Sequence, residues 1–128
     1  MNYHKKILLA EDDLICQNII KLILKDYDNI LLDIVDNGLD LLKLVGEKEY
    51  DLILMDLRMP TISGFDATKI IRTNNGNNKN TPIIAVTACA MDTEKERCFA
   101  MGMNDFIAKP FKLQRLTKTL EKYIWLLF

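Results

Sequence analysis

The clearest pointer to the fold is the run of residues 50–60, which reads YDLILMDLRMP. Its apolar centre has the character of a buried strand, and Asp56 stands directly behind that centre. A turn that contains Pro60 follows. We therefore expect the Asp56 carboxylate to be held rigidly at an edge of a sheet, where it faces solvent.

Two other apolar stretches also end in charged residues. Residues 6–10 run into three consecutive acids at positions 11–13, and residues 105–108 run into Lys109 and a proline. If the strands are parallel, their carboxyl ends meet at one edge of the sheet, so that acids and a lysine gather around Asp56. Such a set can hold a divalent metal beside a carboxylate nucleophile, with the lysine opposite.

Short apolar stretches and longer helical patterns alternate along the chain. Strands are predicted at residues 6–10, 30–35, 51–55, 83–87 and 105–108. Helices are predicted at residues 14–25, 38–47, 64–72, 93–101 and from 113 to about 126. Five such βα units imply an α/β fold with a doubly wound, parallel five-stranded sheet and right-handed crossovers.

Composition fits one globular domain over residues 1–128. Hydrophobic residues make up 49% of the chain and charged residues 27%. The net charge of −1 provides no overall positive field, so nucleic acid and anionic membranes are not expected as direct partners. The three cysteines form no C-x-x-C pair and are expected to be reduced thiols. Because neither a signal peptide nor a membrane-spanning stretch is recognisable, we expect a cytoplasmic protein.

The chain resembles the receiver domain of bacterial response regulators in four segments, which read in order ILLAEDD, ILMDLRMPTISGFD, PIIAVTACA and GMNDFIAKPF. Each is a weak pattern alone, but all four within 128 residues make a specific signal. The wording of AVTACAM and GMNDFIAKPF is most similar to receivers of hybrid histidine kinases and multistep phosphorelays. The resemblance covers nearly the whole chain and implies a flavodoxin-like (βα)5 strand order, with the site at the carboxyl ends of the strands.

The resemblance implies that Asp56 accepts a phosphoryl group from phosphohistidine and that Mg²⁺ binds beside it. Clustered carboxylates repel one another unless a cation separates them, and an oxygen-rich site suits Mg²⁺. In the family's pattern Asp12 is the direct ligand, Glu11 acts largely through water, and the backbone carbonyl of Arg58 completes the set. Glu11 departs from the commoner aspartate. Helix capping is the alternative role for this acidic run, and we assign it to Asp13.

Further positions match the family's pattern around the phosphoryl group. Lys109 would pair with a phosphoryl oxygen as a point charge, and Pro110 fits the family's cis peptide bond. Thr87 offers a hydroxyl to the same group, although a β-branched residue is also ordinary in a strand. Phe106 matches the switch aromatic, which would fill the space that Thr87 vacates on activation. A core phenylalanine that never moves is the alternative for this residue.

Two positions on the rim of the site are expected to set the lifetime of the phosphorylated state. Arg58 and Cys89 lie two residues beyond Asp56 and Thr87, respectively. We expect the long Arg58 side chain to fold over the phosphoryl group and to restrict attacking water. A solvated surface arginine is the alternative.

The expected partner is a histidine kinase or a histidine phosphotransfer protein, because the only histidine, His4, lies in a solvated position ahead of the first strand. In the helix predicted over residues 14–25, a stripe at helical spacing should face the core, namely Cys16, Ile19, Ile20, Ile23 and Leu24. Leu14, Ile15 and Leu22 fall outside the stripe. We expect Leu14 and Ile15 to dock the phosphodonor, although exposed apolar residues are common. The oligomeric state is left open.

Two segments lie outside these motifs. Residues 73–80 are all polar or glycine and predict a mobile, solvated loop ahead of the fourth strand. The chain ends on an apolar run in which Trp125 and Phe128 cannot both reach the core easily. We expect that a partner covers them or that the chain is cut from a longer protein at a domain border.

Two alternatives stand beside a phosphate-accepting receiver. A Mg²⁺-dependent hydrolase or mutase of the haloacid-dehalogenase type usually carries a second acid two residues after its nucleophile, where this chain has Arg58. The second alternative is an interaction module that has kept the fold but lost the phosphorylation chemistry. Against it, the acids, Thr87 and Lys109 form a complete set. As a receiver the chain is no enzyme beyond phosphoryl acceptance and slow self-dephosphorylation. It is either a stand-alone regulator or the receiver part of a hybrid histidine kinase.

Overall fold

Ten elements alternate along the part of the chain that the computed structural model describes, which comprises residues 4–88, 91–110 and 112–124. The strands are β1 (Lys5–Ala10), β2 (Ile30–Val35), β3 (Leu52–Asp56), β4 (Ile83–Thr87) and β5 (Asp105–Ala108). The helices are α1 (Leu14–Leu24), α2 (Gly38–Glu47), α3 (Gly64–Thr73), α4 (Asp92–Ala100) and α5 (Leu113–Tyr123). All strand pairs are parallel, in the order β2-β1-β3-β4-β5. This confirms the doubly wound, flavodoxin-like α/β fold.

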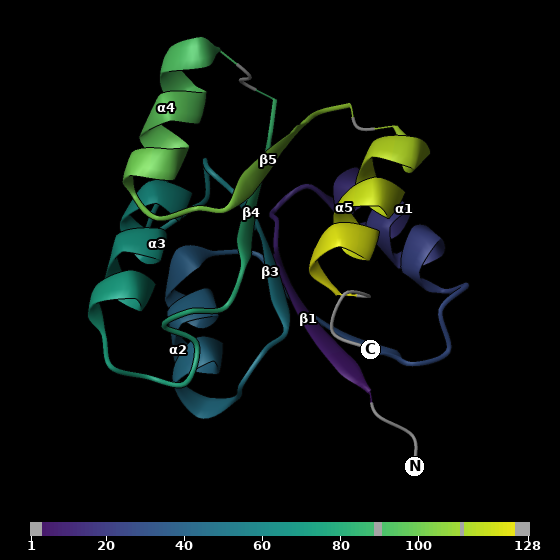
Figure 1. The fold of residues 1–128 in the computed structure, drawn as a ribbon, viewed down its shortest axis with the longest axis horizontal. Helices are drawn as coiled ribbons and strands as arrows, with labels where there is room; N and C mark the ends of the chain where they lie inside the picture. Colours follow the sequence, from purple (N-terminus) through teal and green to yellow (C-terminus); the bar gives the residue numbers. More distant parts are fainter. Residues whose placement is uncertain (1–3, 89–90, 111, 125–128) are drawn as a thin grey trace.

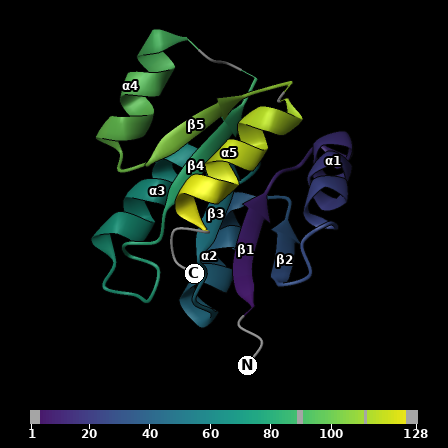
Figure 2. The same ribbon diagram turned by 45° about the vertical axis from the view of Figure 1, so that its right-hand side comes forward.

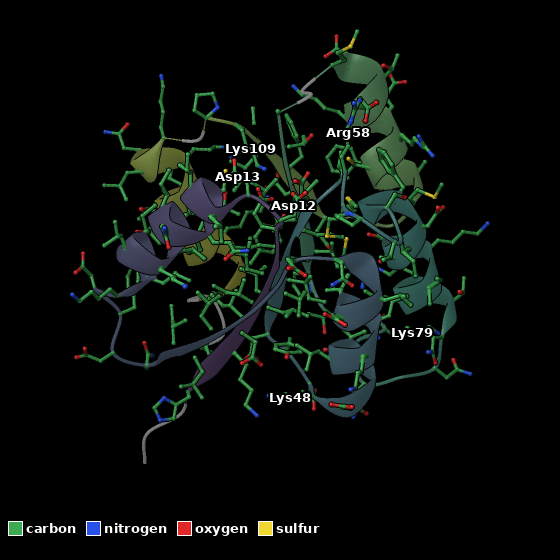
Figure 3. The ribbon with its side chains drawn as sticks, turned by 180° about the vertical axis from the view of Figure 1, so that it is seen from behind. Asp12, Asp13, Lys48, Arg58, Lys79 and Lys109 are labelled. Atoms are coloured by element: carbon green, nitrogen blue, oxygen red, sulfur yellow. The ribbon has the colours of Figure 1, made fainter. Side chains whose placement is uncertain are left out.

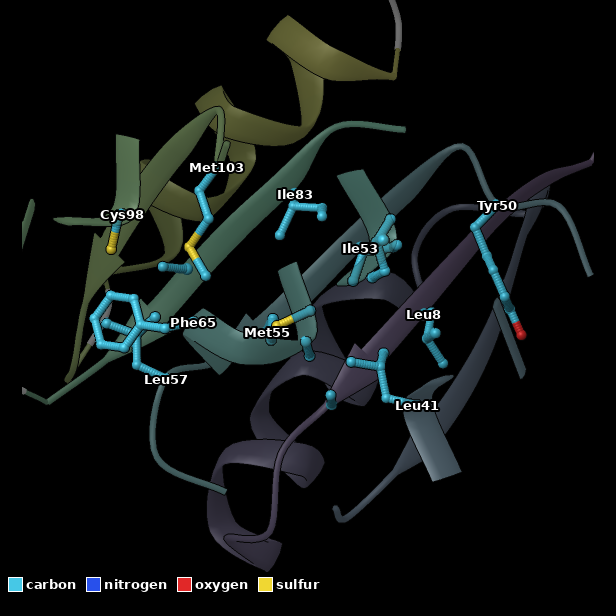
Figure 4. Close-up of a cluster of buried hydrophobic side chains, with 14 residues drawn as sticks. Leu8, Leu41, Tyr50, Ile53, Met55, Leu57, Phe65, Ile83, Cys98 and Met103 are labelled. Carbon is cyan, nitrogen blue, oxygen red and sulfur yellow. The ribbon is translucent and has the colours of Figure 1, made fainter. Parts of the chain in front are cut away.

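Helices cover both faces of the sheet. α1 and α5 lie on one face, and α2, α3 and α4 lie on the other (Figures 1 and 2). Each face therefore has its own hydrophobic core, and Figure 4 shows the core beneath α2, α3 and α4. β3 and β4 are buried along their whole length because both of their faces are covered. The centre of the sheet is thus a rigid support for the residues at the strand ends.

The candidate nucleophile belongs to the sheet itself. β3 begins at Leu52 and ends at Asp56, so it lies one residue later than the strand predicted at residues 51–55. Asp56 is included because it pairs in register with Val86 of β4. The end of the last helix also differs, since α5 is described to Tyr123 and the predictions for Trp125 and Phe128 fall outside the described residues.

The buried face of α1 was predicted only in part. Ile20 and Leu24 are buried, but Ile19 is 39% exposed, so its assignment to the core was wrong. Gln17 lies on the buried side instead, where its side-chain amide donates a hydrogen bond of 2.6 Å to the Glu11 carbonyl. The buried side of α1 therefore includes Gln17, which has a fixed partner, and leaves out Ile19. Three other apolar side chains of this helix are exposed as predicted, namely Leu14, Ile15 and Leu22.

The polar segment between α3 and β4 is anchored, and the expectation of a wholly solvated loop was wrong. Asn78 is only 2% exposed. Its Oδ1 accepts hydrogen bonds from the Tyr50 amide and the Thr81 hydroxyl, and its Nδ2 donates to the carbonyls of Val45 and Lys48. One asparagine thus joins the end of α2 and the approach to β3 to this loop.

Candidate functional site

The polar ends of four strands meet at one edge of the sheet. Glu11 and Asp12 follow β1, Asp56 ends β3, Thr87 ends β4, and Lys109 follows β5. The parallel register aligns these ends with one another. Glu11, Asp12 and Asp56 each have a carboxylate oxygen, and these three oxygens all lie within 4.8 Å of one another. The structure therefore brings together the acids, the hydroxyl and the lysine that the sequence predicted.

Lys109 connects the acids of the site. Its Nζ lies 2.5 Å from Oε1 of Glu11 and 3.3 Å from Oδ2 of Asp56. Burial alone would lower the pKa of Lys109, but the hydrogen bond with Glu11 and the charges of both carboxylates raise it overall, so that the lysine is a cation. The peptide bond between Lys109 and Pro110 is cis, as predicted. Figure 3 shows Lys109 at the same end of the molecule as Asp12, Asp13 and Arg58.

Glu11 is the most deeply buried acid of the set, at 1% exposed. Burial raises its pKa to about 7, because Lys109 only partly offsets the loss of solvent and Asp56 adds a like charge. Within the described residues its Oε2 atom is a buried side-chain oxygen without a hydrogen-bond partner. A buried carboxylate oxygen in need of a partner, beside two more acids, fits a hard divalent cation with oxygen ligands.

Asp56 lines a hollow of about 260 Å³ together with Arg58, Thr87, Ala88 and Lys109. The Asp56 residue is 7% exposed, and its Oδ1 accepts a hydrogen bond of 3.1 Å from the Arg58 amide. Its Oδ2 faces the Lys109 ammonium. The Asp56 carboxylate is thus held on both oxygens, and it is one of the groups that line the hollow.

A glycine allows the turn after β3 to pack closely. A Cβ atom on Gly64 would lie 2.5 Å from the Asp56 carbonyl oxygen and 2.9 Å from the Leu57 Cα. Gly64 begins α3, and its amide donates to the Leu57 carbonyl. The start of α3 therefore supports the backbone that carries the candidate nucleophile. The motif ILMDLRMPTISGFD includes this glycine, but the sequence alone assigned no role to it.

Two neighbours of the acids have other roles. Asp13 caps α1, as predicted, since its Oδ1 accepts from the Ile15 amide at 2.9 Å, and this bond holds its pKa below the usual value. The hydrogen bond from Gln17 to the Glu11 carbonyl fixes the backbone at the other end of the same turn. The sequence offered no signal for Gln17, because its position in the helix falls between the predicted stripe and the exposed face.

The residues expected on the rim are only partly described. The guanidinium of Arg58 lies near α4, with its Nη2 4.0 Å from Oε1 of Glu94, a contact that the sequence did not predict. Cys89 falls outside the described residues. Phe106 packs against the core beneath α2, α3 and α4, and the Lys95 ammonium lies 4.7 Å from the centre of its ring. The movement expected of Phe106 stays a prediction.

Comparison with known proteins agrees with this geometry. The sequence profile of the response regulator receiver domain matches residues 7–121. The chain belongs to this family. The receiver is 39% identical over 119 residues to hybrid signal transduction histidine kinase G of Dictyostelium discoideum, and 34% identical over 144 residues to histidine kinase 5 of Arabidopsis thaliana. These matches cover 92% and 93% of this chain but only 4% and 16% of the two relatives.

Solved structures of other receivers have the same fold. The receiver domain of sensor histidine kinase PA1611 from Pseudomonas aeruginosa is 37% identical, with a TM-score of 0.85 over 94% of this chain and 98% of that one, and it holds a magnesium ion in its active-site cleft. The receiver domain of Ssk1 from Saccharomyces cerevisiae, solved with the histidine phosphotransfer protein Ypd1, is 27% identical, with a TM-score of 0.83 over 96% and 90% of the chains.

Family membership removes one of the alternatives. The chain is a receiver domain of the two-component and phosphorelay type, so the haloacid-dehalogenase alternative was wrong. Among the described residues, no helix is both long and apolar enough to cross a bilayer.

Proposed function

We propose that this receiver accepts a phosphoryl group on Asp56 from the phosphohistidine of a histidine kinase or a histidine phosphotransfer protein. The observation that carries the proposal is the Asp56 carboxylate, which lines a hollow and lies 3.3 Å from the Lys109 ammonium. A carboxylate oxygen attacks phosphorus, the phosphorus–nitrogen bond of the donor breaks, and the donor imidazole keeps the electron pair. Lys109 is placed to pair with an oxygen of the transferred group.

The metal of this site would be Mg²⁺. Asp12 and Asp56 would be direct ligands with the Arg58 carbonyl, and Glu11 would act largely through water. The ion supplies positive charge that offsets the charge of the phosphoryl oxygens. Support comes from the unpartnered, buried Oε2 of Glu11 and from the magnesium ion in the related Pseudomonas receiver. The bound metal would also offset the negative charge of the acidic cluster, which Lys109 would then no longer have to offset alone.

Phosphorylation would change the surface through Thr87 and Phe106. Thr87 is 2% exposed and lines the hollow beside Asp56, so its hydroxyl can turn toward a phosphoryl oxygen. Phe106 comes from β5, which pairs with β4, and could then occupy the space that the threonine leaves. A local change of charge would in this way reach the outer surface around α4 and β5.

The phosphodonor would dock on the exposed apolar residues at the start of α1. Leu14 and Ile15 are each 70% exposed and directly follow the acidic turn of the site. A double Leu14→Lys, Ile15→Lys variant should lose phosphotransfer from its histidine donor while it still reacts with acetyl phosphate. Leu22→Lys is the matched control, because Leu22 is 67% exposed on the same helix but further from the acids. Normal transfer to the double variant would refute this docking surface.

The test of the proposed function is the intact mass of the protein after incubation with Mg²⁺ and acetyl phosphate. One added phosphoryl group is expected, and it should be absent in Asp56→Asn and in a chelated sample. If no adduct forms, beryllofluoride binding shows whether rapid hydrolysis hides it. Failure of both would favour an interaction module without the chemistry. An adduct that persists in Asp56→Asn would instead reject Asp56 as the acceptor.

A further inference from the structure

Arg58 lies between the phosphorylation hollow and α4. It lines the hollow with Asp56, while its Nη2 lies 4.0 Å from Oε1 of Glu94, in the first turn of α4. Figure 3 shows Arg58 beside this end of α4. The Arg58 side chain is 73% exposed, whereas that of Glu94 is 23% exposed. The arginine therefore has room to move, and Glu94 is the more confined partner.

The hollow offers few positive charges to a phosphoryl group. Within the described residues, Lys109 and Arg58 are the cations that line it. Lys109 is confined, with a side chain 14% exposed, and already contacts Glu11 and Asp56. A bound phosphoryl group carries up to about two negative charges and three acceptor oxygens, so it can bind a further cation besides Lys109 and the proposed Mg²⁺. Arg58 is the second cationic side chain of the hollow, and its planar guanidinium suits phosphoryl oxygens.

Glu94 and a phosphoryl group would compete for the same guanidinium. We propose that Glu94 is a positioning residue, which holds Arg58 toward α4 and thereby shortens the lifetime of the phosphorylated receiver. The inference rests on the proposed phosphorylation of Asp56. In hydrolysis a water oxygen bonds to phosphorus, the bond between phosphorus and the Asp56 oxygen breaks, and inorganic phosphate leaves with the protons of the water. Arg58 over the group blocks that water, and Glu94 sets how often it lies there.

The experiment follows the loss of the phosphoryl group by intact mass, with Mg²⁺ present, after acetyl phosphate is removed. Glu94→Gln keeps the size of the side chain and removes its charge. It should slow hydrolysis about two- to fivefold, the range that an exposed ion pair of up to about 1 kcal/mol allows. Arg58→Ala should hydrolyse faster than wild type. When Arg58→Ala is already present, adding Glu94→Gln should leave the hydrolysis rate unchanged. In the otherwise wild-type protein, Glu94→Asp keeps the charge and should hydrolyse near the wild-type rate.

Glu96→Gln is the matched control. Glu96 is exposed on the same helix two residues further, so this variant makes the same change of charge on another side of α4. It should hydrolyse at the wild-type rate. The inference is overturned if Glu94→Gln hydrolyses as fast as wild type or faster, or if its effect is the same without Arg58. Absence of any phosphoryl adduct on wild type would instead reject the proposed function, so the two failures are distinguishable.

Discussion

Removal of the Asn78 side chain is expected to destabilise the receiver more than any other asparagine substitution in its loop. The side chain makes four hydrogen bonds, at 2.8 and 3.0 Å on Oδ1 and at 2.7 and 2.6 Å on Nδ2. A net contribution of about 1 kcal/mol for each bond gives about 4 kcal/mol. Water can reach the partly buried carbonyls of Val45 and Lys48 in Asn78→Ala, which reduces the expected loss to about 3 kcal/mol.

The assay is urea unfolding followed by circular dichroism, in which the midpoint should fall while the slope stays constant. A domain of this size has about 5–15 kcal/mol of stability, so a loss of this magnitude is easily measured. Asn77→Ala is the control, because Asn77 is an exposed neighbour for which no side-chain hydrogen bond is found in the described part of the chain. Its effect should stay within about 0.5 kcal/mol. A loss below about 1 kcal/mol in Asn78→Ala, or equal losses in both variants, would refute the anchoring role.

Two further predictions concern the support of the site and the dependence on pH. Gly64→Ala should lower the free energy of unfolding by about 1–3 kcal/mol and weaken phosphorylation, because its Cβ would lie 2.5 Å from the Asp56 carbonyl oxygen. Gly46→Ala is the control and should be neutral or stabilising, because a Cβ there would have nothing within 4 Å. Equal effects of the two substitutions would contradict the packing argument. The hydrogen bond from the Tyr50 hydroxyl to Asp33, at 2.7 Å, lowers the pKa of Asp33. The unfolded chain therefore binds more protons in acid, so this contribution is complete above about pH 4 and disappears below it. Unfolding measured from pH 3 to 7 should show a difference between wild type and Tyr50→Phe that shrinks below about pH 4; a constant difference would show that the Asp33 charge is not involved.

The arrangement of the candidate site could be predicted because each of its residues stands next to a strong structural signal. Asp56, Thr87 and Lys109 directly end or follow short apolar runs that predict strands. Parallel strands with helical connections place those ends at one edge, whatever the details of the helices. The order of these residues along the chain is therefore enough to predict that the acids, the hydroxyl and the lysine lie together. Asp13 as a helix cap follows from local geometry in the same way.

The contacts between residues that are distant in the sequence depended on the tertiary structure, and so did the buried side of α1. Gln17 is buried in place of Ile19 because the rotation of α1 on the sheet decides which side of the helix faces inward. Asn78 bonds to residues about thirty positions earlier, and Arg58 meets Glu94 of a helix that packs beside the site. A sequence pattern reports the average polarity of a face, and it contains no information on which single polar group meets which distant partner. Such contacts are decided by packing, since only the assembled layers bring a polar side chain within hydrogen-bonding distance of its distant partner.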